Sequence, residues 1–171
     1  SGWTVSAVEN MSSMFNGAQA FNQNISGWTV SAVTDMSSMF NYAKKFNQDI
    51  SDWDVSNVTD MSSMFSSAEA FNQNISSWTV SAVTDMEEMF WNAGKFNQNL
   101  RAWTLNDNVT VTFMFSFAYA MVYHARTTPS VVDNKIGYYF ANKAALQTAV
   151  NGWIDETIDA DDYGDINTWD T

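Results

Sequence analysis

The chain has 171 residues, of which 46% are hydrophobic and 15% aromatic, so it carries enough apolar material for a folded core. Its net charge of −12 disfavours nucleic acid and anionic membrane surfaces as partners. Because the sequence lacks cysteine and a long apolar run, we expect neither a disulfide scaffold nor a transmembrane helix.

A repeated 25-residue unit fills most of the sequence. Columns of identical residues recur at this spacing: Trp3, Trp28, Trp53, Trp78 and Trp103; Met14, Met39, Met64, Met89 and Met114; Phe15, Phe40, Phe65, Phe90 and Phe115. A single unit of this length cannot bury its apolar face alone. We therefore predict that the units stack, with Trp on Trp and Phe on Phe in continuous columns.

Each unit is predicted to contain a short strand and a short helix. In residues 28–31, Trp28 and Val30 would share one face of a strand. The helix is indicated by apolar residues at i, i+3, i+4 and i+7, which are Met36, Met39, Phe40 and Ala43. Thr34 would cap this helix, and Thr84 with Glu87 resembles a capping box. The expected fold class is thus an α/β repeat solenoid of about five coils.

A recurring asparagine and a decaying last unit complete the predicted array. The asparagines that follow the Phe of each Phe-Asn-Gln step (Asn22, Asn47, Asn72 and Asn97) are expected to supply hydrogen bonds to backbone groups at the turn. In the fifth unit Val111 replaces a methionine and Met121 replaces a phenylalanine. Terminal repeats are normally atypical because they cap the core, so the array is predicted to span residues 1–122.

The repeat motif resembles a known family. Val-Thr-Asp-Met-Ser-Ser-Met-Phe at 58–65 and Phe-Asn-Gln-Asp-Ile-Ser at 46–51 are similar to the bacterial surface protein 26-residue repeat, also called the BspA-like repeat, of mycoplasma-type surface lipoproteins. This resemblance covers roughly residues 1–122. It implies a solenoid related to leucine-rich repeats and a cell-surface or extracellular location, and it supplies no catalytic residues. The unit here is one residue shorter than the family's nominal repeat.

The C-terminal segment has a different composition. Residues 123–135 contain Pro129, the single proline, and are predicted to be a linker. Residues 136–171 are predicted to hold an amphipathic helix and then either a cap or the start of a further repeat. The apolar face of that helix would carry Leu146, Val150, Trp153 and Ile154. The array also looks like a segment of a longer surface or secreted protein.

One stretch of the C-terminal segment partly matches an EF-hand calcium loop. From Asp159 to Asp170 it has acids at the loop's positions 1, 3 and 12 and a glycine at position 6, so Asp159, Asp161, Asp165 and Asp170 are candidate calcium ligands. Tyr163 at position 5 departs from the pattern. The alternative is an acidic turn between a helix and a strand, because the repeat already explains Asp170. Calcium is the only cofactor that the sequence indicates.

No catalytic constellation is evident, and we do not expect an enzyme. His124 is the single histidine and has no nucleophile or orienting acid in its neighbourhood. Asp35, Asp60 and Asp85 repeat at one position, which is typical of a structural cap and not of a paired-carboxylate site. The methionines at helical spacing are interpreted as core residues.

Residues that break the repeat pattern are the candidate binding residues. Tyr42, Lys44, Lys45, Trp91 and Arg101 depart from the consensus at positions expected to be exposed, and Trp91 is the foremost candidate contact. Rows of threonine and serine also recur beside the tryptophans. They are compatible with ice binding, but equally with the preference of Thr for strands and Ser for turns.

The function expected from these features is recognition without catalysis. A scaffold module contacting a protein or a glycan comes first, a subunit or tether of a large complex is the alternative, and an ice-binding solenoid is a further alternative. Five Asn-X-Ser/Thr sequons, at Asn10, Asn24, Asn57, Asn74 and Asn108, would accept glycans in a secreted chain. They also follow from the repeat consensus.

Overall fold

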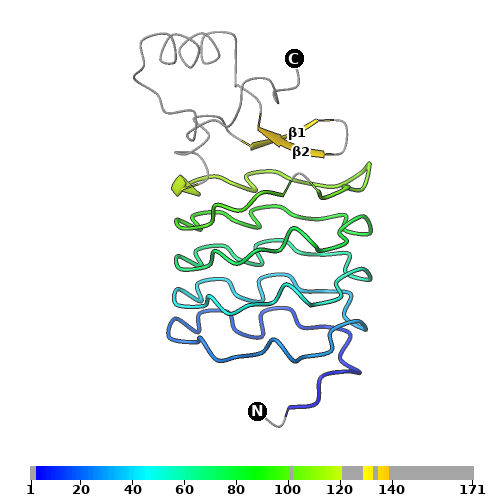
Figure 1. Cartoon of the computed structure of the whole chain (residues 1–171), viewed down its shortest axis with the longest axis vertical. Helices are drawn as coiled ribbons and strands as arrows, with labels where there is room; N and C mark the ends of the chain where they lie inside the picture. The colour runs from blue at the N-terminus through cyan, green and yellow to red at the C-terminus, as the bar shows by residue number, and fades with distance from the viewer. Residues whose placement is uncertain (1–2, 101, 121–128, 133–134, 139–171) are drawn as a thin grey trace.

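The computed structural model describes residues 3–100, 102–120, 129–132 and 135–138. Residues 3–100 and 102–120 form a stack of coils, one for each 25-residue unit (Figure 1). Parallel bridges join equivalent positions of successive coils and mark five of them: Asn10 to Asp35, Asp35 to Asp60, Asp60 to Asp85, and Asp85 to Thr110. The chain therefore rises by one coil in every repeat, in constant register.

Two short strands follow the stack. Strand β1 spans Pro129–Val132 and strand β2 spans Lys135–Tyr138. They pair antiparallel, with Pro129 opposite Tyr138 and Val132 opposite Lys135. This hairpin occupies part of the predicted linker and the start of the predicted C-terminal segment. The boundaries at 122 and 135 stay predictions.

The prediction of an α/β solenoid with a helix and a strand in each coil is wrong. Within the described residues, helical conformation is confined to Tyr119 and Ala120, and no coil of the stack contains an extended strand. The segment expected to be helical is instead a run of tight turns. In the first coil, Met14, Asn16 and Ala18 each donate their N–H to the carbonyl three residues earlier.

The segment forms turns because every second N–H group donates its hydrogen bond to a carbonyl of the next coil. Ser13, Phe15 and Gly17 donate to carbonyls of residues 37, 39 and 41, at 2.9, 2.9 and 2.7 Å. An α-helix would direct those same N–H groups along its own axis, to the residue four positions back. Bonding between coils thus replaces bonding within a helix, and the capping box predicted at Thr84 and Glu87 is absent. The Thr84 hydroxyl donates to the Thr59 carbonyl, and the Glu87 N–H donates to the Asp85 carboxylate.

This path requires two left-handed residues in every coil. Both occupy the third position of a turn, where a type II turn needs a positive φ. The two columns are Ser13, Ser38, Ser63, Glu88 and Phe113, and Gly17, Tyr42, Ser67, Asn92 and Phe117, with φ between 52° and 73°. Only one of these ten residues is glycine, so side chains are held in a conformation that they rarely adopt.

The core matches the apolar columns of the sequence. Met36, Met39, Phe40 and Ala43 are fully buried, as their spacing predicted. Equivalent phenylalanine rings stack from coil to coil, as with Phe40 on Phe65 at 5.6 Å between ring centroids. Within one coil Phe40 also stacks on Phe46 at 3.9 Å. The aromatic columns therefore run through the whole stack and lie in contact with each other.

Tryptophan and asparagine provide side-chain ladders that bind each coil to the one before. The indole Nε1 groups of Trp53, Trp78 and Trp103 donate to carbonyls 28 residues earlier, at 3.3, 3.1 and 3.0 Å. Asn22 Oδ1 accepts from the Asn47 N–H and from Gln48 Nε2, both at 2.9 Å. The same pair of bonds recurs at Asn47 and Asn72. These bonds confirm the structural role expected for the asparagine column.

Replacing Gly17 by alanine tests the left-handed turns. Gly17 has φ +73° and no atom within 4 Å of an added Cβ, so the cost of alanine is conformational. We expect the free energy of unfolding to fall by about 1 kcal/mol. Gly27→Ala is the matched control, because Gly27 also has open space but is not left-handed; it should leave stability unchanged or raise it slightly. Equal urea midpoints for the two variants would contradict the turn.

Replacing Asn72 tests the asparagine ladder. Asn72 Oδ1 accepts from the Asn97 N–H at 2.9 Å and from Gln98 Nε2 at 2.7 Å. Asn72→Ala removes both bonds and should lower the free energy of unfolding by about 1–2 kcal/mol. Asn72→Asp keeps the accepting oxygen and should lose much less. Thermal unfolding of the two variants would show whether the acceptor, and not the side-chain volume, matters.

Candidate functional site

The turn segments of the five coils make one continuous surface, which we call the turn face. It comprises residues 13–19, 38–44, 63–69, 88–94 and 113–119. Hydrogen bonds hold equivalent positions in line: Tyr42 N–H donates to the Ser66 carbonyl at 2.8 Å, and Ser67 N–H donates to the Trp91 carbonyl at 2.7 Å. A side chain that departs from the repeat is thus displayed at a fixed position on a regular surface.

Three of the candidate binding residues lie on the turn face, and a fourth lies beside it. Tyr42 and Lys44 belong to the second coil and Trp91 to the fourth, so they are separated by about 10 Å of stack. Tyr42 is 47% exposed, and Trp91 is partly buried. Lys45 directly follows Lys44 and is exposed. Arg101 and the candidate calcium ligands Asp159, Asp161, Asp165 and Asp170 lie outside the described residues.

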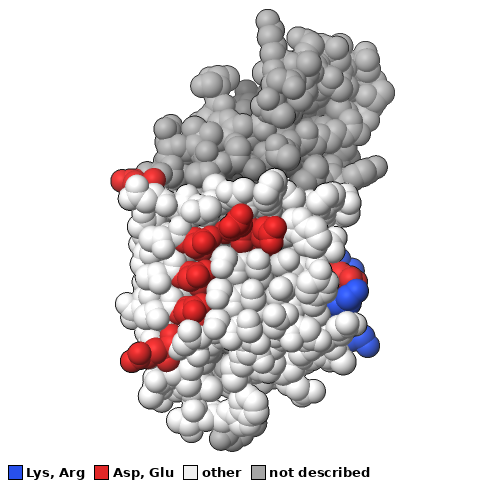
Figure 2. Space-filling model, turned by 180° about the vertical axis from the view of Figure 1, so that it is seen from behind, with Lys and Arg blue, Asp and Glu red and all other residues white. Residues whose placement is uncertain are grey.

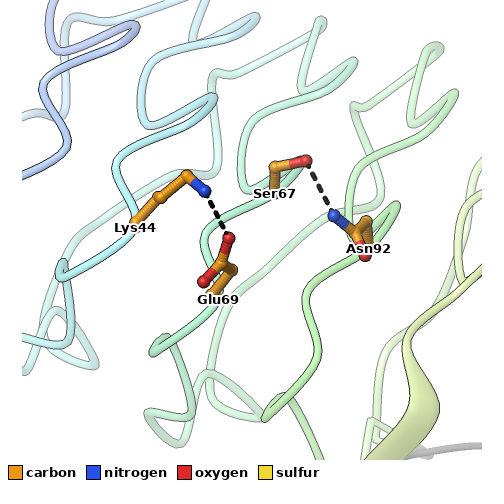
Figure 3. A network of polar contacts seen from close by, with 4 residues as sticks. All are labelled: Lys44, Ser67, Glu69 and Asn92. Atoms are coloured by element: carbon orange, nitrogen blue, oxygen red, sulfur yellow. Dashed lines mark hydrogen bonds and ion pairs between the residues drawn. The ribbon is translucent and has the colours of Figure 1, made fainter.

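Polar contacts between coils occupy several side chains of this face. Lys44 Nζ lies 2.7 Å from the Glu69 carboxylate, and Asn92 Nδ2 donates to Ser67 Oγ at 3.2 Å (Figure 3). Both partners of the ion pair are substantially exposed, so the pair adds little to stability. Because it neutralises Lys44, this lysine offers a partner less charge than the sequence suggested.

An aromatic cluster at the last coils was missed by the sequence analysis. Trp91 meets Phe117 edge to face at 5.6 Å, and Phe117 meets Tyr119 at 6.2 Å. Phe117 is 53% exposed and Tyr119 is 61% exposed. The equivalents of Phe117 in earlier coils are Gly17, Tyr42, Ser67 and Asn92. Phe113 is also exposed, at the other left-handed column. We call Trp91, Phe117 and Tyr119 the aromatic cluster.

The signal that could have located this cluster is present in the sequence. Phe113, Phe117 and Tyr119 stand at positions where the other units carry mostly small, polar or charged residues, with Tyr42 as the one other aromatic residue. The prediction of a decaying last unit rested on changes such as Val111 and Met121 and did not include these three residues. Large aromatic residues on an exposed column are the more informative departure, because they expose apolar surface that the fold does not need.

A row of carboxylates runs along another part of the stack. It forms the red stripe in Figure 2, whereas the lysines lie at the edge of that view. Asp35 and Asp60 each accept hydrogen bonds from the N–H and the hydroxyl of the serine two residues later, at 2.7–2.9 Å. They cap turns, not helices. Among the described residues no group of three or more His, Cys, Asp or Glu side chains could hold a metal ion.

Two further aspartates cap exposed turns. Hydrogen bonds from the Ser56 hydroxyl and then the Ser56 N–H lower the pKa of Asp54 below its ordinary value of 3.8. At Asp49 the N–H of Ser51 is the main cause of the lowered pKa and its hydroxyl the second. A carboxylate with a depressed pKa stabilises the folded state above its ordinary pKa, and this contribution disappears as the pH falls through the folded value.

The two aspartates predict a small acid sensitivity. As the pH falls below 3.8 and through the lowered pKa values, the folded chain should lose a small part of its stability because the carboxylates become protonated; the loss is small because both are exposed. Asp49→Asn with Asp54→Asn removes the titrating groups but keeps an accepting oxygen. The double variant should therefore show a flatter dependence of the urea midpoint on pH. An identical slope in both proteins would exclude these two caps as the source.

Among the described residues, no helix has the length and the apolar composition that a membrane span requires.

Comparison with known proteins gives one family match. The model of the family described as "Mycoplasma protein of unknown function, DUF285" matches residues 1–103 and, in a second alignment, residues 28–128. No curated protein and no solved structure matches the chain. The matched residues include the described coils and cover well over half of the sequence. The chain therefore belongs to this repeat-containing family.

Proposed function

We propose that this chain is a recognition and scaffold module that binds a protein or glycan partner through the turn face. The observation that carries the proposal is the aromatic cluster. Phe117 and Tyr119 expose large rings on a surface whose equivalent positions are otherwise mostly small or polar. Rigid, exposed aromatic residues are enriched among the residues that dominate binding energy.

The backbone supports this role because it holds the cluster rigidly. Phe117 has φ 61°, a left-handed conformation fixed by the turn between Phe115 and Ala118. Trp91 contacts Phe117 from the neighbouring coil. The rings are therefore already oriented before a partner binds, so that ordering them costs little conformational entropy on association. A glycan could stack on such rings, and a protein could cover them with apolar side chains.

The negative net charge of the chain indicates which surfaces a partner could have. With a net charge of −12 the molecule attracts basic surfaces, repels strongly anionic ones and leaves neutral surfaces such as uncharged glycans unopposed. A cell-surface or extracellular location would suit such a module and forms part of the proposal. The same surface would serve a structural subunit of a large complex, in which the partner is a permanent neighbour.

Ice binding is supported by one observation and weakened by another. Thr4, Thr29, Thr79 and Thr104 are exposed in a row, as an ice-binding surface would require. Asp54 occupies the third position of that row, and its carboxylate accepts two hydrogen bonds from Ser56. A charged group interrupts the regular hydroxyl spacing. Absence of thermal hysteresis in the purified chain would remove this alternative.

The proposal is tested by returning the cluster to the repeat pattern. Trp91→Ser and Phe117→Ser copy Ser66 and Ser67, which stand at the equivalent positions. We expect the double variant to keep the fold and to lose at least about 30-fold in affinity, since paired anchor residues of this kind contribute about 2 kcal/mol or more. The probes are an array of neutral, sialylated and sulfated glycans, and surface proteins from the same source.

A control variant separates this loss from a general change of the surface. Thr79→Ala alters an exposed side chain outside the turn face and should bind like the parent. Circular dichroism of all variants checks that the stack is intact. Unchanged binding by the double variant would overturn the placement of the site on the aromatic cluster. Preference for sulfated glycans would contradict the argument from charge.

A further inference from the structure

The Asn-X-Ser/Thr sequons differ in the hydrogen bonds that their asparagine side chains make. The distinction depends on where the side-chain amide nitrogen of each asparagine points, because that nitrogen is the atom to which an N-linked glycan is attached. Asn24 and Asn74 occupy the same position in the first and third coils, and both are exposed. Asn10 and Asn57 occupy other positions of the coil. All four sequences satisfy the motif equally well, so any difference between them comes from the structure.

At Asn24 and Asn74 the carboxamide is oriented by its oxygen. Asn24 Oδ1 accepts from the Ser26 N–H at 2.9 Å and from Ser26 Oγ at 2.8 Å. Asn74 Oδ1 accepts from the Ser76 N–H at 3.0 Å and from Ser76 Oγ at 2.7 Å. A backbone N–H can only donate, which fixes the oxygen as the inward atom and leaves Nδ2 pointing away from the turn. Within the described part of the chain, neither Nδ2 has a hydrogen-bond partner.

At Asn57 the nitrogen is the inward atom. Asn57 Nδ2 donates to the Ser31 carbonyl of the preceding coil at 2.9 Å. The hydroxyl of the same sequon is also engaged, because Thr59 Oγ1 donates to the Thr34 carbonyl at 3.1 Å. Both groups of this sequon therefore bind the neighbouring coil. Presenting Asn57 to an enzyme would require two bonds between coils to break.

At Asn10 the side-chain nitrogen Nδ2 is hydrogen-bonded to a carboxylate. Asn10 Nδ2 donates to Asp35 Oδ2 at 2.9 Å, and the two residues are joined by the bridge between their coils. A glycan on this nitrogen would lie over the row of carboxylates and would displace a charge-assisted hydrogen bond. Asn10 Oδ1 also accepts from the Ser12 N–H at 2.8 Å and from Ser12 Oγ at 2.7 Å, so this sequon makes the same turn as Asn24 and differs from it in the bond that holds Nδ2.

We propose that the folded stack selects Asn24 and Asn74 as acceptors of N-linked glycans and protects Asn10 and Asn57. The donor is a lipid-linked oligosaccharide pyrophosphate. In the transfer a bond forms between Nδ2 and the anomeric carbon of the first sugar, and the bond from that carbon to the pyrophosphate oxygen breaks. The amide gives up one proton, and the lipid pyrophosphate leaves. Acceptors two coils apart place the glycans about 10 Å from each other along the stack.

The selection is independent of the proposed binding function. It requires only that the folded chain meets an oligosaccharyltransferase, and neither acceptor belongs to the turn face. Glycans at Asn24 and Asn74 would flank Asp49, which stands at the equivalent position of the second coil and makes the same turn with Ser51. One column of the stack would thus carry glycan, carboxylate and glycan in successive coils.

The test compares the folded and the denatured chain with the same enzyme. The purified protein is incubated with a single-subunit oligosaccharyltransferase and lipid-linked oligosaccharide, once folded and once in the lowest urea concentration that unfolds it. Site occupancy is measured by mass spectrometry of peptides. Asn108→Gln is introduced in all samples, because Asn108 is exposed and belongs to a fifth sequon whose signal would complicate the comparison.

The folded chain should be modified at Asn24 and Asn74 at least about tenfold faster than at Asn10 and Asn57, since Nδ2 of the latter two must first break a hydrogen bond to the neighbouring coil. The denatured chain should show no such ranking. Asn57→Gln with Asn10→Gln should leave the folded chain's glycosylation unchanged, whereas Asn24→Gln with Asn74→Gln should abolish most of it. Equal occupancy of all four sites in the folded chain, or modification of Asn24 and Asn74 only after denaturation, would overturn the proposal.

Discussion

The hydrogen bonds that alternate N–H groups of the turn segment donate to the next coil are the interaction on which this structure depends. They fix the spacing of the coils, and they require the backbone to turn sharply at every second residue. The left-handed residues follow from that requirement, including Tyr42 and Phe117, where a large side chain is held at positive φ. Such residues are normally costly. In the first four coils this cost is offset, because the alternate N–H groups each donate to a carbonyl of the next coil.

The side chains of the core adapt to this spacing. Phenylalanine rings stack at 5.5–5.7 Å along the Phe15 column and at 5.8–5.9 Å along the Phe21 column. Both values exceed the separation of hydrogen-bonded strands, about 4.8 Å. Rings tilted or offset relative to the stack axis satisfy both distances. Aromatic columns and backbone ladders thus stabilise the same register, and a slip of one residue would break both at once.

Much of this architecture could be predicted from the sequence, and the path of the backbone could not. The period, the buried faces of Met39 and Phe40, and the asparagine ladder all follow from residues repeated at one spacing. The helix prediction failed because apolar residues at i, i+3, i+4 and i+7 also suit a run of turns that bury one side. Gly17 and Asn92 were the available signals of a left-handed column. Tyr42 and Phe117 at the same column masked them, since tertiary contacts override the local preference of those residues.

Some residues of the candidate site could be predicted from the sequence, and others could not. Trp91 was identified because it departs from a strict consensus, and the structure brings it against Phe117. Phe117 and Tyr119 were not identified, because the changes considered in the last unit, among them Val111 and Met121, were attributed to capping. The distinction depends on exposure, which periodicity alone does not give. Conversely, Lys44 looked like a free charge in the sequence, and its ion pair with Glu69 became visible only when coils were placed side by side.

The constant register between coils has a consequence for how the chain reaches its native state. Each coil offers its neighbours almost the same set of donors, acceptors and rings, so the second coil could pair with the fourth nearly as well as with the third. Such a mispaired array would loop out one whole unit and keep most of its ladders intact. Near-identical units therefore create competing alignments of similar energy, and the off-consensus residues are what distinguish the correct alignment from the others.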